Sequence, residues 1–148
     1  MKLAQIQMHV TADKAANLRH AEELLRSVRG ADMAILPEMF CCPYDNSCFR
    51  AYGEPTGGAA YQMLSRAARE LGLWLVGGSL PELDDGRVYN TSFVFDPQGV
   101  CVARHRKMHL FDIDVEGGQR FRESDTLSPG HDVTLFDTPW GRMGLCIC

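Results

Sequence analysis

The first part of the chain carries three hydrophobic patterns in a fixed order, and that order limits the folds available to it. Apolar and polar residues alternate over residues 4–9, which predicts a strand. A helix is predicted next, with Asp13 as its N-cap and Gly30 beyond its end. The continuous apolar run at residues 33–36 then predicts a strand buried on both faces. The strand–helix–strand order implies a parallel pair joined by a right-handed crossover. The apolar residues at helical spacing are Leu18, Ala21, Leu24, Leu25 and Val28.

The rest of the chain is predicted to contain one further helix and five further strands. The helix ends at Gly72, and the turn Asp96-Pro97-Gln98-Gly99 joins two strands into a hairpin. Residues 40–58 are predicted to be loop-like, and residues 107–130 form a long connecting segment. We therefore expect an α/β fold, a mixed sheet with helices on one face, without repeats or an internal domain boundary. The predicted helix spans about residues 59–71, and the strands lie at 73–77, 89–95, 100–106, 133–136 and 142–147.

Charge and composition disfavour several classes of partner. The net charge is −4 and the pI is near 5.7, which argues against nucleic acid or an anionic membrane. No apolar run approaches the roughly 20 residues of a membrane span, and the polar residues near the N-terminus interrupt any signal-peptide core. Cys146 and Cys148 would lie about 6.5 Å apart on one strand, which is poor spacing for a disulfide. We therefore expect a cytoplasmic protein, with its six cysteines in a reducing compartment.

Three residues able to carry chemistry share one placement. Glu38, Lys107 and Cys148 each follow the end of a predicted strand. If these strands are neighbours, the three side chains converge on one site. Taken singly, each has a more ordinary interpretation: a helix cap or surface charge for the glutamate, a solvated charge for the lysine and a small core residue for the cysteine.

The three residue types suit nucleophilic catalysis. Cysteine attacks as a thiolate, and a nearby ammonium favours that form by roughly 4 kcal/mol at about 4 Å and an effective dielectric of about 20. A carboxylate in the same pocket opposes part of this effect, so Glu38 is interpreted as the proton acceptor. The pattern indicates a nucleophile (Cys148), a base (Glu38) and an electrostatic partner (Lys107).

Local motifs around these residues resemble those of the nitrilase, or carbon–nitrogen hydrolase, superfamily. Leu36-Pro37-Glu38-Met39-Phe40 looks like its glutamate motif, and His105-Arg106-Lys107-Met108-His109-Leu110 looks like its lysine motif. Gly144-Leu145-Cys146-Ile147-Cys148 looks like the start of its cysteine motif, and the order Glu, Lys, Cys agrees along the whole chain. Residues 107–114 and 123–130 look most like the ω-amidase branch.

The resemblance implies an αββα sandwich and an amidase that hydrolyses small-molecule amides, such as short dicarboxylate monoamides, through a thioester without a cofactor or metal. It selects Cys148 over Cys146 and gives Glu123 the place of a second glutamate that positions substrate and lysine. Tyr44 and Phe111 are candidate walls of the substrate pocket. The family tends to form dimers or larger assemblies, so a homo-oligomer is expected.

The family motif continues beyond its cysteine with an aromatic and an acidic residue. Residues 1–148 are therefore expected to be about the first half of a carbon–nitrogen hydrolase domain, truncated on its C-terminal side. The N–H of the residue after the cysteine usually completes the oxyanion site in this family. A cation for the distal carboxylate of the substrate is also expected beyond Cys148.

Alternatives from the residues remain open at this level. Other activities of the superfamily, on nitriles or N-carbamoyl compounds, use the same triad. Asp112, Asp114, Glu116 and Glu123 fall on EF-hand positions, which suggests a non-catalytic calcium-binding module, although no helix is predicted before the loop. Further options are a cysteine–histidine pair, a zinc site and a scaffold protein without turnover. The residues concerned are His105, His109 or His131 with Cys148 for the pair, and Cys41, Cys42 and Cys48 for zinc.

Overall fold

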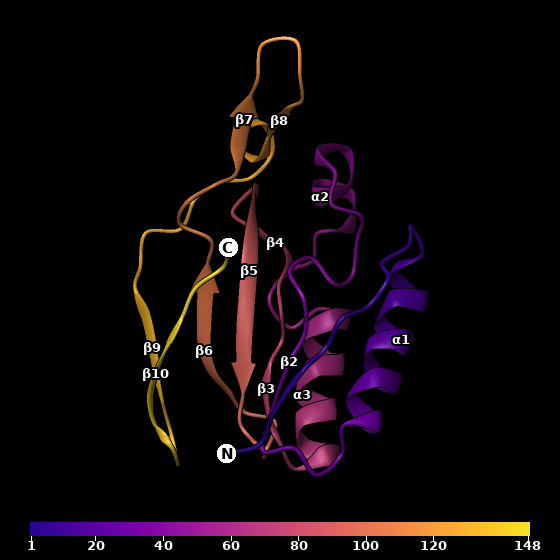
Figure 1. Cartoon of the computed structure of the whole chain (residues 1–148), viewed down its shortest axis with the longest axis vertical. Helices are drawn as coiled ribbons and strands as arrows, with labels where there is room; N and C mark the ends of the chain where they lie inside the picture. Colours follow the sequence, from indigo (N-terminus) through magenta and orange to yellow (C-terminus); the bar gives the residue numbers. More distant parts are fainter.

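The computed structural model describes residues 1–148 and contains one large sheet, two small hairpins and three α-helices (Figure 1). The helices are α1 (Lys14–Ser27), α2 (Asn46–Tyr52) and α3 (Ala59–Leu71), with a 3₁₀ turn at Glu123–Asp125. None of them is long and apolar enough to cross a membrane. The strands are β1 (Leu3–Gln5), β2 (Met33–Ile35), β3 (Trp74–Val76), β4 (Leu80–Asp84), β5 (Arg87–Phe95), β6 (Cys101–Arg106), β7 (Asp112–Asp114), β8 (Arg120–Arg122), β9 (Thr134–Thr138) and β10 (Gly141–Leu145).

The large sheet is mixed, because parallel and antiparallel pairs meet at β3. Strands β1, β2 and β3 are parallel neighbours, as the strand–helix–strand pattern predicts. The long strand β5 runs antiparallel to β3 and β4 along one edge and to β6 along the other. Consequently β2 and β6 point the same way, and the residues that follow them lie at the same end of the sheet. A register shift between Val94 and Phe95 fixes how β6 pairs with β5.

Helices α1 and α3 cover one face of the sheet and build the main core (Figure 1). Asp13 caps α1 by accepting a hydrogen bond from the backbone of Ala16 at 2.9 Å, and Gly72 ends α3 in the left-handed conformation. The apolar stripe of α3 packs on the sheet beneath it. Its buried members are Ala60, Met63, Leu64, Ala67 and Ala68.

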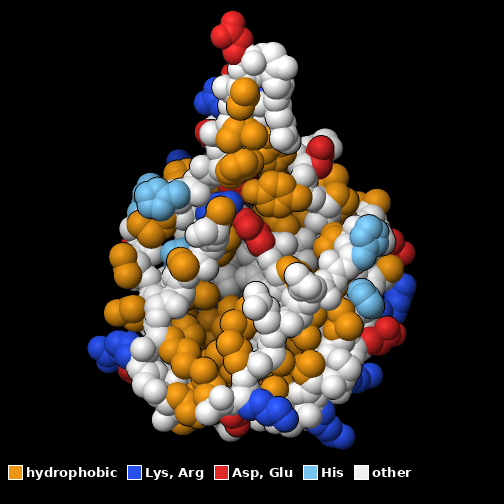
Figure 2. Space-filling model, in the orientation of Figure 1, with side chains coloured by type: hydrophobic (Ala, Val, Ile, Leu, Met, Phe, Trp, Pro, Cys, Tyr) orange, Lys and Arg blue, Asp and Glu red, His pale blue; other side chains and the backbone are white.

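The opposite face of the sheet meets the β9–β10 hairpin. The ring of Phe136 stacks on Trp74 with centroids 6.4 Å apart, and Met143 and Leu145 pack on the same cluster. Much of the hairpin remains open to solvent, with Leu135 58% exposed. Figure 2 shows hydrophobic side chains gathered over the lower part of this view, with the charged side chains mainly at its margins.

The predicted fold class is confirmed: the molecule is α/β, with a mixed sheet and helices on one face. Several elements differ from the sequence prediction. The predicted connecting segment at residues 107–130 contains the β7–β8 hairpin and a 3₁₀ turn. Residues 40–58 contain α2, whose first turn is capped by Asp45, so this segment is not entirely loop. Strand β4 was not predicted, because its centre contains Pro81 and the charged, buried Glu82.

Candidate active site

Lys107 immediately follows β6, and its ammonium is buried between two carboxylates. The side chain is 1% exposed. Its Nζ lies 2.9 Å from Oε1 of Glu38 and 3.0 Å from Oε2 of Glu123. Burial alone would lower the pKa of Lys107, but the hydrogen bonds and negative charges of both glutamates outweigh it, and the net shift is upward. The lysine is therefore a fixed positive charge at neutral pH.

Glu38 lies in the turn that follows β2, and the chain geometry there is tightly set. Met39, the next residue, has a positive φ of 51°, and its backbone N–H donates to the hydroxyl of Ser79. The carboxylate of Glu38 accepts hydrogen bonds from Lys107 and from the side chain of Asn90, at 2.9 and 2.8 Å. About a third of the side chain remains accessible, so the carboxylate is held but still reachable.

Glu123 is wholly buried, and three groups donate to its carboxylate. Besides Lys107, these are the hydroxyl of Tyr44 and the backbone N–H of Phe111, the latter at 2.6 Å. The backbone of Glu123 in turn donates to the carbonyl of Phe111 at 3.1 Å. Three donors, one of them an ammonium, hold this buried carboxylate in one orientation. Glu123 thus holds the far side of the lysine in place.

Tyr44 and Phe111 lie close to these groups but differ in how they contribute. Burial, the hydrogen bond to Glu123 and the negative charges nearby raise the pKa of Tyr44, and Glu38 and Cys148 are among those charges. Its ring packs against Phe49 and Phe121. Phe111 contacts Glu123 through its backbone, while its side chain is 42% exposed. Neither side chain lines the two cavities beside Cys148, so a role in the pocket wall stays a prediction.

Cys148 follows β10 and borders two cavities. One, of about 170 Å³, is also lined by Glu38, Ser79 and Ser92. The other, of about 260 Å³, is mostly apolar and is lined by His105 among others. The thiol is free and exposed, so it is accessible to a ligand.

The structure thus brings together Glu38, Lys107 and Glu123 by direct contact, with Cys148 on a cavity shared with Glu38. Asn90, in the middle of β5, also belongs to this cluster and was not identified from the sequence. Nothing in its local pattern distinguishes it, because its partner Glu38 is 52 residues away.

The alternative calcium site is wrong on geometry. Residues 112–122 form the β7–β8 hairpin instead of a helix-flanked loop, and Glu123 faces Lys107. Asp112 and Asp114 pair with arginines of β8 instead of converging on one point. The pairing of His105 with Cys148 is also not supported, since the ring nitrogen Nδ1 lies 3.0 Å from the hydroxyl of Thr134. Burial lowers the pKa of His105.

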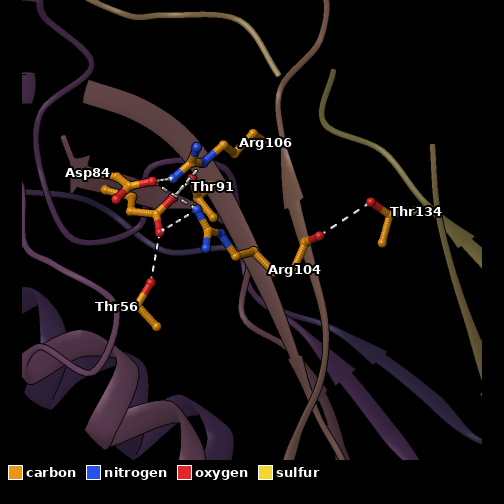
Figure 3. A network of polar contacts seen from close by, with 7 residues as sticks. Thr56, Asp84, Thr91, Arg104, Arg106 and Thr134 are labelled. Carbon is orange, nitrogen blue, oxygen red and sulfur yellow. Dashed lines mark hydrogen bonds and ion pairs between the residues drawn. The ribbon is translucent and has the colours of Figure 1, made fainter. Parts of the chain in front are cut away.

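A second charge cluster, built around the buried Glu82, lies on the helix-covered face of the sheet (Figure 3). Arg104 and Arg106 pair with the buried Glu82 at 3.0 and 2.9 Å, and both also face Asp84. The hydroxyl of Thr91 donates to Glu82 at 2.8 Å. The two arginines neutralise the buried Glu82 carboxylate. Arg106 and Lys107 therefore serve opposite faces of the sheet.

The fold is an α/β fold, a mixed sheet backed by helices. A buried lysine lies between two glutamates, beside an accessible cysteine. These residue types are suited to nucleophilic attack on carbonyl compounds. The carbon–nitrogen hydrolase family model matches residues 2–148. The chain belongs to the carbon–nitrogen hydrolase family.

Individual relatives with high sequence identity also support this membership. The omega-amidase NIT2 of Danio rerio is 47% identical over 99% of this chain, and that of Bos taurus is 48% identical over the same share. In each case the match covers 54% of the relative, so the chain spans about half the length of the curated relatives it matches. Among solved structures, Saccharomyces cerevisiae Nit3, a member of branch 10 of the nitrilase superfamily, is 35% identical with a TM-score of 0.85. That match covers 100% of this chain and 55% of Nit3.

Proposed function

We propose that this chain carries the reacting groups of a cysteine-dependent amidase of the ω-amidase type, which hydrolyses small-molecule amides and releases ammonia. The observation that supports it is the buried Lys107 ammonium between Glu38 and Glu123, next to a cavity that Glu38 shares with Cys148. The similarity to omega-amidase NIT2 supports short dicarboxylate monoamides as the substrate class.

In the proposed first half-reaction, Glu38 accepts the thiol proton of Cys148, and the thiolate attacks the amide carbonyl carbon. A carbon–sulfur bond forms and the carbonyl electrons move to oxygen. The Lys107 ammonium, fixed in its charged form by the two glutamates, stabilises this oxyanion. Collapse of the intermediate breaks the carbon–nitrogen bond. Glu38, now protonated, gives its proton to the departing nitrogen, which leaves as ammonia.

The second half-reaction consumes one water. Glu38 takes a proton from the water, and the hydroxide attacks the thioester carbonyl, again with Lys107 facing the oxyanion. The carbon–sulfur bond breaks, the proton returns to the sulfur, and the product is a carboxylic acid. Glu123 takes no proton in this scheme. Its buried carboxylate holds Lys107 and fixes the distance between the ammonium and Glu38.

The remaining features of the proposal rest on family membership and on the chain's own composition. Residues 1–148 form the N-terminal part of a carbon–nitrogen hydrolase domain, and the protein works as a homo-oligomer. The six free cysteines agree with a cytoplasmic location. Nitriles and N-carbamoyl acids are the competing substrate classes, because the same nucleophile and base serve both.

Substitution of the cysteines tests the proposal directly. In full-length protein, Cys148→Ala should abolish ammonia release from a dicarboxylate monoamide, whereas Cys146→Ala should retain most of it. Comparison of kcat/KM for monoamides, nitriles and N-carbamoyl acids then ranks the substrate classes. Retained turnover in Cys148→Ala would remove this residue from the chemistry, and a preference for nitriles would reject the ω-amidase assignment alone.

A further inference from the structure

Asn90 connects two groups of the active site from a fixed position in the sheet. It lies in β5, pairs with Pro81 of β4, and is fully buried. Its backbone carbonyl accepts a hydrogen bond from the backbone N–H of Lys107 at 2.8 Å. Its side-chain Nδ2 donates to Oε1 of Glu38 at 2.8 Å. One residue therefore ties the main chain of the lysine to the carboxylate of the glutamate.

The orientation of this amide is determined by its partner. An ionised carboxylate only accepts hydrogen bonds, so the NH₂ group of Asn90 must face Glu38. The other end, Oδ1, is then buried without a hydrogen-bond partner. A buried, unpaired acceptor destabilises a fold, and such groups in native proteins call for a reason. The donation to Glu38 supplies one, because it requires an amide at this position.

The two oxygens of Glu38 consequently differ. Oε1 accepts from both Lys107 and Asn90, whereas Oε2 accepts no hydrogen bond from the protein. The carboxylate lines the cavity shared with Cys148 and is the partly accessible member of the cluster. The free oxygen is the one open to a proton in the cavity, since both donors already occupy Oε1.

We propose that Asn90 is a positioning residue that holds Oε1 of Glu38 and so leaves Oε2 as the oxygen that exchanges protons with the cysteine and the water. This inference rests on the proposed function, in which Glu38 is the base. Without the second donor, the carboxylate is tied only to Lys107 and turns about its end. Misplacement of a base by about 1 Å costs roughly a hundredfold in rate.

The experiment uses Asn90→Ala and Asn90→Asp in the full-length protein, with Thr91→Val as a matched control. Thr91 is the adjacent residue of β5, is equally buried, and also donates to a glutamate (Glu82) at 2.8 Å, but on the opposite face. The measurements are kcat and KM for a monoamide, the pH profile of kcat/KM, and the midpoint of urea unfolding. Asn90→Asp keeps the volume of the side chain, and the urea midpoint shows whether either variant has lost its fold.

In Asn90→Ala, kcat should fall about tenfold to a hundredfold with KM within about twofold, the size expected for one hydrogen bond to a charged group. Asn90→Asp should lose more, because it places a second carboxylate beside Glu38. The acidic limb of the pH profile of kcat/KM should move to higher pH in both variants, because Glu38 loses a hydrogen-bond donor. The other charged and titratable neighbours of Glu38 are unchanged in these variants: Lys107, Glu123, Tyr44 and Cys148. Thr91→Val should lower the unfolding midpoint and leave kcat and the pH profile unchanged.

The possible failures are distinguishable. If Asn90→Ala and Asn90→Asp keep the kcat and pH profile of the parent while Glu38→Gln is inactive, the base is correct and the positioning role is wrong. If Thr91→Val loses as much kcat as Asn90→Ala, the effect is one of general stability and the proposal is overturned. If Glu38→Gln itself retains turnover, the proposed function fails first.

Discussion

Glu123→Gln is the most informative single substitution, because it removes a charge and almost no volume. The carboxylate receives Lys107, Tyr44 and the backbone N–H of Phe111. In glutamine one of the two oxygens becomes an NH₂ group. The hydroxyl of Tyr44 can turn and accept from it, but the ammonium and the backbone N–H cannot. The amide should therefore face Tyr44, and Lys107 should lose its charged partner on this side.

The magnitude follows from the distance. At 3.0 Å and an effective dielectric of about 20, the Lys107–Glu123 attraction is about 5.5 kcal/mol before desolvation is subtracted. Removing one partner of a buried pair costs about 3–5 kcal/mol. Lys107 keeps Glu38, so we expect the lower end, a loss of about 3 kcal/mol in the free energy of unfolding. The ammonium should then shift towards Glu38, away from the oxyanion, and kcat should fall about a hundredfold.

Glu82→Gln provides the control for this prediction. Glu82 is as buried as Glu123 and pairs with Arg104 and Arg106 at similar distances, but on the helix-covered face. Urea unfolding should show comparable losses for the two variants, and ammonia release should fall only in Glu123→Gln. Equal kcat in Glu123→Gln and the parent would refute the claim that Glu123 positions the lysine. Equal losses of kcat in both variants would mean that stability alone explains them.

Two further predictions concern the backbone of the site and the response to pH. In Gly78→Ala the new Cβ would lie 2.1 Å from the carbonyl oxygen of Pro37, at a φ of 56°. The free energy of unfolding should fall by about 2–4 kcal/mol, and kcat should drop as Glu38 shifts. An unchanged kcat would contradict the coupling between Gly78 and Glu38. Burial lowers the pKa of His105. Below about pH 6.5 the unfolded chain therefore binds a proton that the folded chain does not. The free energy of unfolding should decline with falling pH by up to about 1.4 kcal/mol per pH unit. Urea titrations at pH 5 and 7.5 should show this decline reduced in His105→Gln, and an identical decline would assign it to other groups.

Most of the architecture was predictable because hydrophobic spacing and end signals agree with the final packing. Asp13 caps α1, Gly72 ends α3, and the apolar run that begins at Met33 forms the buried strand β2. Each of these signals acts within a few residues of the element it defines. Local chemistry was sufficient where the local preference and the tertiary environment point the same way.

Elements whose stability depends on distant partners were missed. Strand β4 contains Glu82, a residue that suggests an exposed position until Arg104 and Arg106 are placed beside it. The turn after β4, with Asp85 and Gly86 both at positive φ, did carry a hairpin signal that could have identified it. The segment containing α2 has few apolar residues at helical spacing, so only its cap at Asp45 indicated a helix.

The candidate site also contains residues that the local sequence identifies and residues that depend on distant partners. Glu38, Lys107 and Cys148 could be selected because their residue types, their places after strands and their order along the chain agree. Asn90 could not, because a buried amide differs from a surface amide only through its surroundings. The burial of Lys107 was equally invisible, since the basic run Arg104–Arg106 before it suggests a solvated strand end.

The shift in register between β5 and β6 has a consequence for how the length of this chain can vary. Because successive residues of an extended chain face opposite sides, Arg106 at the end of β6 meets the carboxylates under the helices. Lys107, directly after it, meets Glu38 and Glu123. Inserting one residue in the turn at 96–99 would move Arg106 to the face that Lys107 now occupies and place a guanidinium beside Glu38 and Glu123.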